Sequence, residues 1–173
     1  RYGNPSRGLR IIAVTGTNGK TTTACYINEI LKEAGFKTAL FTTAVIEITG
    51  QEKLNDLNAT VPTVAKLFRF FRAARRKGAE YVILEATSHA LWQHKFDGVP
   101  IEAAVMTNLT QDHLDYHKTM KQYAAAKAKL FEKKPKYIVL NRDDAWFDYF
   151  NQFTAREQKM TYGMNPEAEA HIT

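Results

Sequence analysis

Short apolar runs alternate along the chain with longer stretches in which apolar residues recur every three or four positions. The runs are rich in Val, Ile and Tyr, as in buried strands, and the longer stretches have the period of an amphipathic helix. The predicted strands are residues 10–15, 37–42, 80–86, 103–107, 136–140 and 159–162. The predicted helices are residues 20–34, 63–77, 120–133 and 143–152. Because strands and helices alternate, we predict an α/β fold with a doubly wound, mostly parallel sheet and helices on both faces.

The helix predicted at 63–77 has the clearest pattern. Val64, Leu67, Phe68 and Phe71 stand at positions i, i+3, i+4 and i+7 and form one apolar face. We therefore expect the phenylalanines of this segment in the core, not on a surface that stacks bases. Residues 47–62 are the only long stretch without a regular period, and we predict an irregular loop there, of the kind that is often functional.

The segment AVTGTNGKTTTACYINEIL, residues 13–31, combines a strand, a glycine-containing loop and a helix. Gly16 follows the strand and Gly19-Lys20-Thr21 begins the helix, which is the context of a phosphate-binding loop. In such a loop, backbone N–H groups surround phosphate oxygens, the helix N-terminus and the lysine add positive charge, and the threonine hydroxyl can bind Mg²⁺. The predicted fold is therefore like that of P-loop NTPases.

The spacing of this loop departs from the commonest pattern. The motif G-x-x-x-x-G-K-[ST] would place a glycine where this chain has Val14. Taken alone, the segment is a damaged loop, a chance match or a loop of another kind.

Polar residues follow two other predicted strands. Glu85 closes the apolar run YVIL, where an unpaired carboxylate would be costly. It lies at the carboxyl edge of the sheet, where ligands bind in doubly wound folds. We interpret it as a Mg²⁺ ligand or an orienter of water, with a salt bridge as the alternative. The segment TNLTQDHLDYH follows the next strand, and its clustered acids and imidazoles favour metal or phosphate chemistry.

A lysine interrupts the apolar face of the helix predicted at 120–133. Lys127 stands four residues after Tyr123 and four before Phe131, whereas Lys129 falls off this face. Among apolar neighbours the charged form of a lysine is disfavoured and its pKa falls, so the free amine becomes available as a nucleophile. The alternative is that the aliphatic stem is buried and the ammonium reaches solvent.

Composition narrows the class of protein. A chain of 173 residues with 45% hydrophobic and 24% charged residues fits one soluble globular domain. It has no apolar run of about 18 residues and no signal peptide, so we predict no membrane insertion. The single Cys25 suits a reducing cytoplasm. The net charge of +6 is spread along the chain or gathered at predicted helix ends, which favours anionic small molecules over nucleic acid as partners.

Five segments occur in the order and at the spacings typical of Mur ligases, the ATP-dependent enzymes that build the peptide of peptidoglycan. They are GTNGKTTT, EATSHAL, TNLTQDHLDYH, AAKAKLF and NRDD. From residue 9 to about 172 the chain resembles the central ATP-binding domain of this family, in particular of members that add the third amino acid. The loop of these enzymes begins T-G-T-N/H-G-K, so Val14 is expected and the loop is intact.

The resemblance implies an amide-forming reaction that uses ATP and Mg²⁺. The carboxylate of UDP-MurNAc-L-Ala-D-Glu would attack the γ-phosphate of ATP to give an acyl phosphate, and an amino acid would then expel phosphate. By the same resemblance the ATP phosphates would be held by Gly16, Thr17, Asn18, Gly19, Lys20, Thr21 and Thr22. One Mg²⁺ would be bound by Thr21 and Glu85 and a second by His113. Lys127 would act as a carbamate formed with CO₂, and the catalytic set would be Lys20, Glu85, His113 and Lys127.

Substrate contacts implied by the resemblance are Thr60, Thr87, Gln93 and Lys95. Three departures from the family pattern lie at or next to these positions. Ala59-Thr60 replaces a Thr-Thr pair, Thr87 replaces a serine, and Lys95 stands where an arginine is usual. Lysine lacks the bidentate geometry of arginine, so these departures bear on the acceptor more than on ATP chemistry.

The resemblance also concerns domain organisation. Family members carry an N-terminal UDP-binding domain and a C-terminal amino-acid-binding domain, and we expect residues 1–173 to be a central domain that is incomplete at its C-terminal end. The alternatives are another ligase of this fold, such as a folylpolyglutamate or cyanophycin synthetase, and a non-catalytic ATP-binding regulatory module. The DHLDYH and SHAL segments and the joint presence of Glu85, His113 and Lys127 favour the Mur-type ligase.

Overall fold

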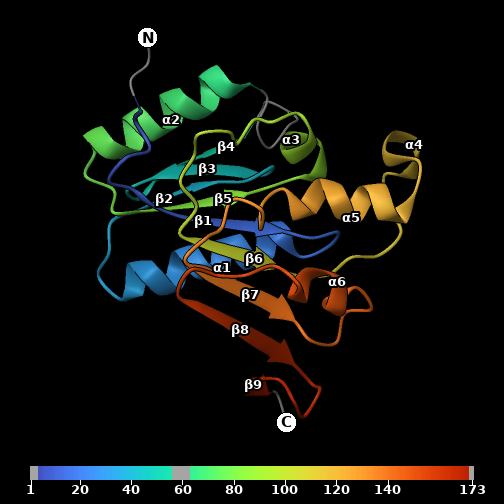
Figure 1. The fold of residues 1–173 in the computed structure, drawn as a ribbon. Coiled ribbons are helices and arrows are strands. Elements are labelled where there is room, and N and C mark those ends of the chain that lie inside the picture. Colours follow the sequence, from blue (N-terminus) through green and yellow to red (C-terminus); the bar gives the residue numbers. More distant parts are fainter. Residues whose placement is uncertain (1–3, 56–62, 172–173) are drawn as a thin grey trace.

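A mixed β-sheet forms the centre of the protein (Figure 1). The structure is a computed structural model, and it describes residues 4–55 and 63–171. Across these residues the strands of the sheet lie in the order β4-β3-β2-β5-β1-β6-β7-β8-β9. The pairs β2–β3 and β3–β4 are antiparallel, and the other neighbouring strands are parallel. The strands are β1 (Arg10–Thr15), β2 (Thr38–Phe41), β3 (Val45–Ile48), β4 (Gln51–Leu54), β5 (Tyr81–Glu85), β6 (Ala103–Met106), β7 (Tyr137–Asn141), β8 (Gln158–Gly163) and β9 (Ala170–His171).

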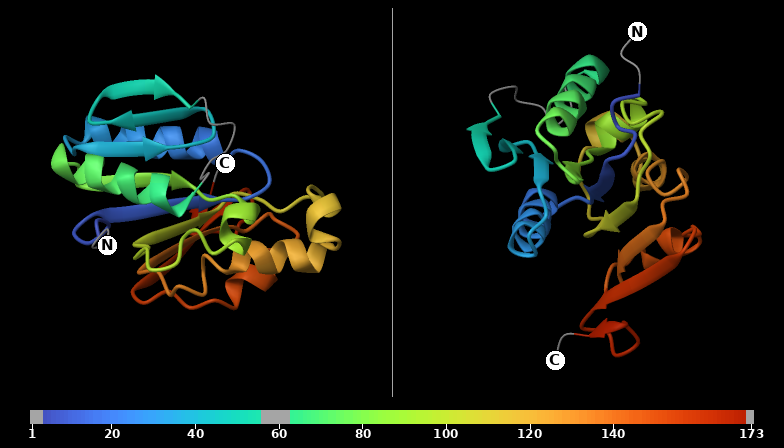
Figure 2. Two further views of the ribbon diagram at one scale, coloured as in Figure 1. Left: turned by 90° about the horizontal axis from the view of Figure 1, so that it is seen from above. Right: turned by 90° about the vertical axis from the view of Figure 1, so that its left-hand side faces the viewer.

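Helices lie on both faces of the sheet, as Figures 1 and 2 show. Helix α1 covers one face and packs against β1, β2 and β5, whereas α2, α3 and α5 lie on the opposite face. The helices are α1 (Lys20–Glu33), α2 (Val64–Arg76), α3 (Ser88–Trp92), α4 (Leu114–His117), α5 (Met120–Ala128) and α6 (Phe147–Asn151). Within the described ranges, no helix is both long enough and apolar enough to cross a membrane.

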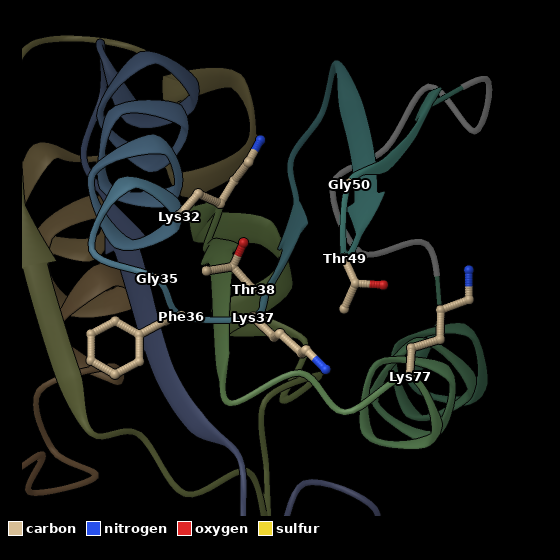
Figure 3. A pocket seen from close by; sticks show the side chains of 8 residues that line it. All are labelled: Lys32, Gly35, Phe36, Lys37, Thr38, Thr49, Gly50 and Lys77. Carbon is tan, nitrogen blue, oxygen red and sulfur yellow. The ribbon is translucent and has the colours of Figure 1, made fainter.

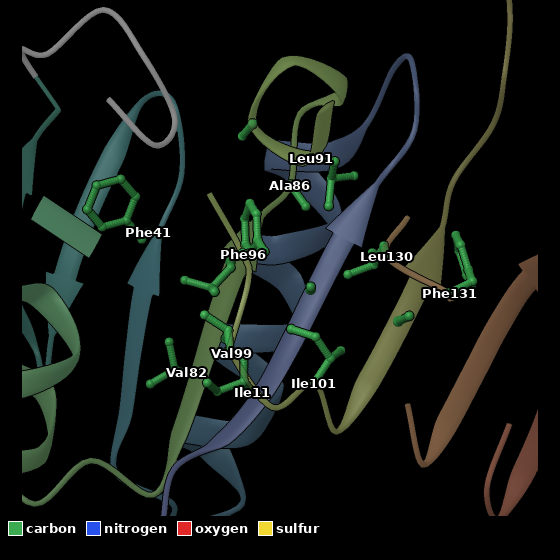
Figure 4. Close-up of a cluster of buried hydrophobic side chains, with 14 of the residues drawn as sticks. Ile11, Phe41, Val82, Ala86, Leu91, Phe96, Val99, Ile101, Leu130 and Phe131 are labelled. Atoms are coloured by element: carbon green, nitrogen blue, oxygen red, sulfur yellow. The ribbon is translucent and has the colours of Figure 1, made fainter. Parts of the chain in front are cut away.

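The alternation of side chains along β1 divides the core into two clusters. Ile11 and Ala13 face the larger cluster, under α2, α3 and α5, and Val14 faces the smaller one, under α1. Figure 4 shows part of the larger cluster, where Phe131 and Leu130 meet the central strands. Because β1 lies between the parallel strands β5 and β6, the loops that follow these three strands leave the sheet at one edge.

The predicted α/β fold with a mostly parallel sheet is confirmed. The strand predicted at 10–15 has the same bounds in the structure, and the other predicted strands differ by at most one residue at either end. Helix α2 buries Leu67, Phe70 and Phe71, and Phe68 packs against the core while partly exposed, so the predicted core placement of the phenylalanines is confirmed. The predicted apolar face is wrong at Val64, which is 45% exposed at the start of the helix.

The prediction that residues 47–62 form an irregular loop is wrong for residues 47–54. Strands β3 and β4 form a hairpin on the edge of β2, with a turn at Thr49 and Gly50, which have φ angles of 48° and 81°. The hydrophobic pattern does not predict these strands, because the charged residue Glu47 is buried in β3 and every residue of β4 is exposed. The Glu47 carboxylate is compensated by the Asn28 amide at 3.0 Å and the Lys32 ammonium at 3.3 Å.

The other corrections concern helix length. The helix predicted at 120–133 ends at Ala128 in α5, and turns replace it before Lys134, whose φ is 51°, and Pro135. The helix predicted at 143–152 is reduced to α6. Helices α3 and α4 have five and four residues, too few to show a period, and neither was predicted.

Candidate active site

The loop between β1 and α1 depends on glycine at two positions. Gly16 has a φ of 149°, and a Cβ atom there would lie 1.8 Å from the Thr107 hydroxyl oxygen. Gly19 has a φ of 77°, in the left-handed region, and is the N-cap residue of α1. The loop can therefore pass close to β6 and then turn into the helix, which leaves the N-terminus of α1 facing the site.

The segment after β6 holds this loop in place. The backbone N–H of Thr17 donates to the Asn108 carbonyl at 2.8 Å, and that of Asn18 donates to the Asn108 side chain at 3.0 Å. The carbonyl of Asn18 accepts from Thr107 Oγ1 at 2.7 Å and from Asn108 Nδ2 at 3.0 Å. Thr107 and Asn108 open the TNLTQDHLDYH segment, but no local pattern marks them as residues that hold the loop.

Lys20 lies over the loop that it follows. Its ammonium donates to the Thr17 carbonyl at 2.7 Å. Burial lowers the Lys20 pKa, and the negative charges of Glu85 and Asp112 oppose that change. The next residues, Thr21 and Thr22, are partly buried and exposed, respectively. Residues 16–22 thus form a loop and the first turn of α1, and the Lys20 ammonium folds back over the loop.

Glu85 lies at the end of β5, directly beside the loop. Register pairs Glu85 with Val14 of β1, and only 3% of Glu85 is exposed. Its Oε2 atom accepts from Thr21 Oγ1 at 2.8 Å and from the Thr43 backbone N–H at 2.9 Å. Among the described residues Glu85 makes no ion pair, so the salt-bridge alternative is wrong. Two neutral donors compensate its burial instead.

Thr21 and Glu85 place a hydroxyl and a carboxylate oxygen side by side. This donor set fits Mg²⁺, which prefers oxygen ligands and commonly takes only one or two from protein, the rest coming from water and phosphate. In the part of the chain that the structure describes, no three His, Cys, Asp or Glu side chains form a metal centre. A Mg²⁺ here would therefore depend on oxygen atoms of a bound nucleotide and water.

The acid and imidazole cluster after β6 divides into two parts. His113 has a side chain that is 46% exposed, lies 3.4 Å from the Asp112 carboxylate, and has a φ of 52°. His117 turns inward instead: it is 3% exposed, and its Nε2 lies 2.9 Å from Ser88 Oγ. Burial, reinforced by the charges of His89 and Lys127, lowers the His117 pKa to about 4. His117 is therefore a neutral core residue, and His113 remains the accessible imidazole.

Lys127 is buried beneath the phosphate loop. It is 1% exposed, and its Nζ donates to the Gly16 carbonyl at 2.6 Å. Burial, together with the charge of Lys20, lowers the Lys127 pKa to about 7. The prediction that Lys127 lies on the buried face is confirmed, and the alternative in which its ammonium reaches solvent is wrong. The free amine is well populated near neutral pH.

Lys129 differs from Lys127 although both lie at the end of α5. It is only partly buried, and its Nζ lies 3.1 Å from His94 Nε2 and 4.5 Å from the Trp92 ring centroid. Its ammonium faces α3 and not the phosphate loop, so Lys129 provides a matched control for Lys127.

The predicted substrate-contacting residues that the structure describes lie on and after α3. Thr87 is the N-cap of α3, and its hydroxyl accepts from the Ala90 N–H at 3.3 Å, a role that threonine and serine share. Gln93 is exposed and lies 3.5 Å from the Tyr116 hydroxyl, and burial lowers the Lys95 pKa. Ala59 and Thr60 lie outside the described residues.

A cavity of about 450 Å³ is lined by residues that do not belong to the candidate site (Figure 3). It is formed where α1 ends and β2 begins, at the opposite edge of the sheet from the phosphate loop. Its lining residues are Lys32, Gly35, Phe36, Lys37, Thr38, Thr49, Gly50 and Lys77. None of the predicted site residues lines this cavity. The candidate site is therefore identified from the chemistry of its side chains and not from the cavity.

Comparison with known proteins identifies a family and close relatives. The Mur ligase middle domain matches residues 14–173. A UDP-N-acetylmuramoyl-L-alanyl-D-glutamate--2,6-diaminopimelate ligase of Geobacillus kaustophilus is 43% identical over 176 residues, which cover 97% of this chain and 35% of the relative. A ligase of the same name from Aquifex aeolicus is 43% identical over 163 residues, covering 94% and 33%. The chain thus spans about a third of the length of these relatives.

Solved structures agree with this assignment. A structure of a UDP-N-acetylmuramoyl-L-alanyl-D-glutamate--2,6-diaminopimelate ligase superposes with a TM-score of 0.84 at 37% identity, covering 94% of this chain and 34% of that one. A folylpolyglutamate synthase of Mycobacterium tuberculosis complexed with ADP and AMPPCP gives 0.71 at 18% identity, covering 92% and 44%. At that identity the likeness concerns the fold alone.

Proposed function

The chain belongs to the Mur ligase family, and from this premise we propose that it is the ATP-binding domain of a peptidoglycan precursor ligase. The reaction is the ATP-dependent addition of the third amino acid to UDP-MurNAc-L-Ala-D-Glu. We place it in the cytoplasm, with the UDP-dipeptide and an amino acid as partners and no nucleic acid. In this proposal further domains bind the UDP group and the amino acid, since relatives are about three times longer.

One observation carries the proposal: a buried lysine amine lies against the carbonyl of a phosphate loop. A simple nucleotide-binding module has no need for a second cation below the loop, since burying an unpaired charge is destabilising. Lys127 Nζ lies 2.6 Å from the Gly16 carbonyl and is kept from solvent, so a free amine is positioned where phosphates bind. This arrangement favours a ligase over a regulatory module.

The residues of the chain have distinct roles in this proposal. N–H groups of residues 16–22 and the Lys20 ammonium bind the ATP phosphates and neutralise charge on the transferring group. Thr21 and Glu85 would hold one Mg²⁺, and His113 would hold a second. When bound, these ions offset phosphate charge and fix the orientation of the γ-phosphate.

Lys127 takes part as a carbamate in this proposal. Its neutral amine adds to CO₂, an N–C bond forms, and one proton is released to solvent. The product is an anion in place of a costly buried cation. Thr87, Gln93 and Lys95 on the α3 side contact the UDP-dipeptide, as does Thr60. The acyl phosphate formed from that substrate then reacts with the amino acid, and phosphate leaves.

A chimeric enzyme tests the proposed reaction. Residues 14–173 replace the matching segment of the Geobacillus kaustophilus ligase, and ADP release is measured with and without the UDP-dipeptide and diaminopimelate. We expect turnover that depends on both substrates, and a Lys20→Ala chimera serves as the inactive control. The isolated chain should bind Mg-ATP weakly and form no amide. A folded chimera that binds ATP but shows no substrate-dependent turnover would contradict the proposal.

A further inference from the structure

Tyr123 connects the two parts of the candidate site. It lies on α5, one turn before Lys127, and is only 1% exposed. Its hydroxyl oxygen lies 3.3 Å from Thr17 Oγ1 in the phosphate loop. Its ring centroid lies 4.4 Å from Lys127 Nζ. One side chain thus contacts both the loop that receives phosphate and the buried amine.

The hydrogen bonds of Thr17 indicate the direction of the contact with Tyr123. Thr17 Oγ1 accepts from the Thr110 N–H at 3.0 Å and donates to the Thr110 carbonyl at 3.2 Å. A threonine hydroxyl has one proton and two lone pairs, so one acceptor position remains. The Tyr123 hydroxyl fills it as the donor. Thr17 is therefore held from two sides, by the segment after β6 and by α5.

The ring of Tyr123 lies next to both the Lys127 amine and the histidines of the site. Its centroid lies 5.2 Å from the His117 ring and 6.1 Å from the His113 ring. An aromatic ring at this position excludes water from the amine. Exclusion of water favours the neutral amine, while the attraction of the ring face for a cation only partly opposes this.

We propose that Tyr123 is a positioning residue, whose hydroxyl holds the phosphate loop at Thr17 and whose ring shields the Lys127 amine. The role of the hydroxyl concerns nucleotide binding by any loop of this kind. The role of the ring rests on the proposed function, in which Lys127 must react as a free amine. Two substitutions separate the two roles: Tyr123→Phe removes only the hydroxyl, and Tyr123→Leu also removes the ring.

The first experiment measures ADP binding to this chain by calorimetry, with and without Mg²⁺. We expect Tyr123→Phe to weaken ADP about three- to tenfold in both conditions, since one hydrogen bond that prearranges the loop is lost. Tyr149→Phe is the matched control because Tyr149 lies on α6 and makes no contact with the loop. Equal ADP affinity for Tyr123→Phe and wild type would overturn the role of the hydroxyl.

The second experiment measures access to the Lys127 amine, independently of any carbamate. Acetic anhydride converts a free amine to an amide with release of acetic acid, and mass spectrometry gives the rate at each lysine. We expect acetylation of Lys127 to be about fivefold or more faster in Tyr123→Leu, with little change in Tyr123→Phe, while Lys129 stays constant as the internal reference. Where Tyr123→Leu fails to unfold cooperatively, Tyr123→Met is used in its place.

Equal Lys127 rates in wild type and the folded ring-deletion variant would overturn the role of the ring. If the proposed function is wrong, Lys127 forms no carbamate, but the ADP affinities and acetylation rates of the Tyr123 variants still change as expected. The two failures are therefore distinguishable.

Discussion

Two ionisable side chains are buried to nearly the same extent on the two sides of the loop after β1, one on β5 and one on α5. Their hydrogen-bond partners differ. Glu85 at the end of β5 is 3% exposed, and Lys127 on α5 is 1% exposed. The Glu85 carboxylate accepts hydrogen bonds from Thr21 and Thr43. The Lys127 amine has the Gly16 carbonyl and the face of Tyr123. Two donors compensate the burial of the Glu85 carboxylate, whereas a single carbonyl and a ring do not offset the burial of the Lys127 ammonium.

This difference shows that burial alone does not determine the chemistry of a side chain. On the β5 side two hydrogen-bond donors hold a carboxylate oxygen next to the Thr21 hydroxyl, an oxygen pair that suits a divalent cation. On the α5 side the surroundings of Lys127 favour loss of a proton, which suits its proposed reaction as a nucleophile. The phosphate loop lies between the two sides, so a bound nucleotide would contact both.

The largest effect is expected at Lys20, which lies between the two sides. Lys20→Ala should weaken ADP binding by about 3 kcal/mol, roughly a hundredfold, because a charge-assisted contact to phosphate is lost. Lys20 also repels the Lys127 ammonium, so its removal should raise the Lys127 pKa. Calorimetry measures the first change and acetylation rates against pH the second. An unchanged affinity would mean that the loop is not a phosphate site.

A smaller effect is expected on the β5 side. Glu85→Gln keeps the oxygen that accepts from Thr21 and Thr43 but removes the charge. We expect the enhancement of ADP binding by Mg²⁺ to fall by about tenfold, with binding in the absence of Mg²⁺ nearly unchanged. Titrations with Mg²⁺ and with EDTA measure the ratio. The prediction fails if the Mg²⁺ enhancement of the variant equals that of wild type.

The third prediction concerns stability on the α5 side. Burial lowers the Lys127 pKa from 10.5 to about 7, so between these values the unfolded chain binds more protons than the folded one. Wild-type stability should therefore rise with pH across this window, and the buried charge should be destabilising below pH 7. Lys127→Met removes this dependence.

The stability of Lys127→Met relative to wild type should be highest at and below pH 7 and fall by about 4 kcal/mol as the pH rises to 10.5. Urea unfolding in bicarbonate-free buffer measures this difference. Parallel stability curves for the two proteins would contradict the proposed deprotonation.

Much of this site could be predicted from sequence because its parts lie at the ends of regular elements. The loop after β1 and Glu85 after β5 follow from strand patterns and the rule that ligands bind at carboxyl strand ends. Lys127 was predictable because it stands four residues from both Tyr123 and Phe131 on an apolar face. Each of these predictions rests on the spacing of apolar residues along a strand or a helix, which can be read directly from the sequence.

Other features depend on contacts between distant segments, which a local pattern does not encode. Asn108 lies 90 residues from Asn18 in the chain yet fixes the loop backbone, and Tyr123 lies 106 residues from Thr17. The contact of His117 with Ser88 could likewise not be predicted, because it depends on where α3 packs in the fold. The hairpin was missed because β4 is exposed on both faces and therefore shows no alternation.

The central claim is that Lys127 reacts as a free amine beneath the phosphate loop, and carbon-13 NMR with labelled bicarbonate tests it most directly. Wild type and Lys129→Ala should both give a carbamate signal near neutral pH, since the neutral amine is well populated at a pKa of about 7. Lys127→Ala should lack it. A signal that survives in Lys127→Ala, or the absence of any signal from wild type, would contradict the account.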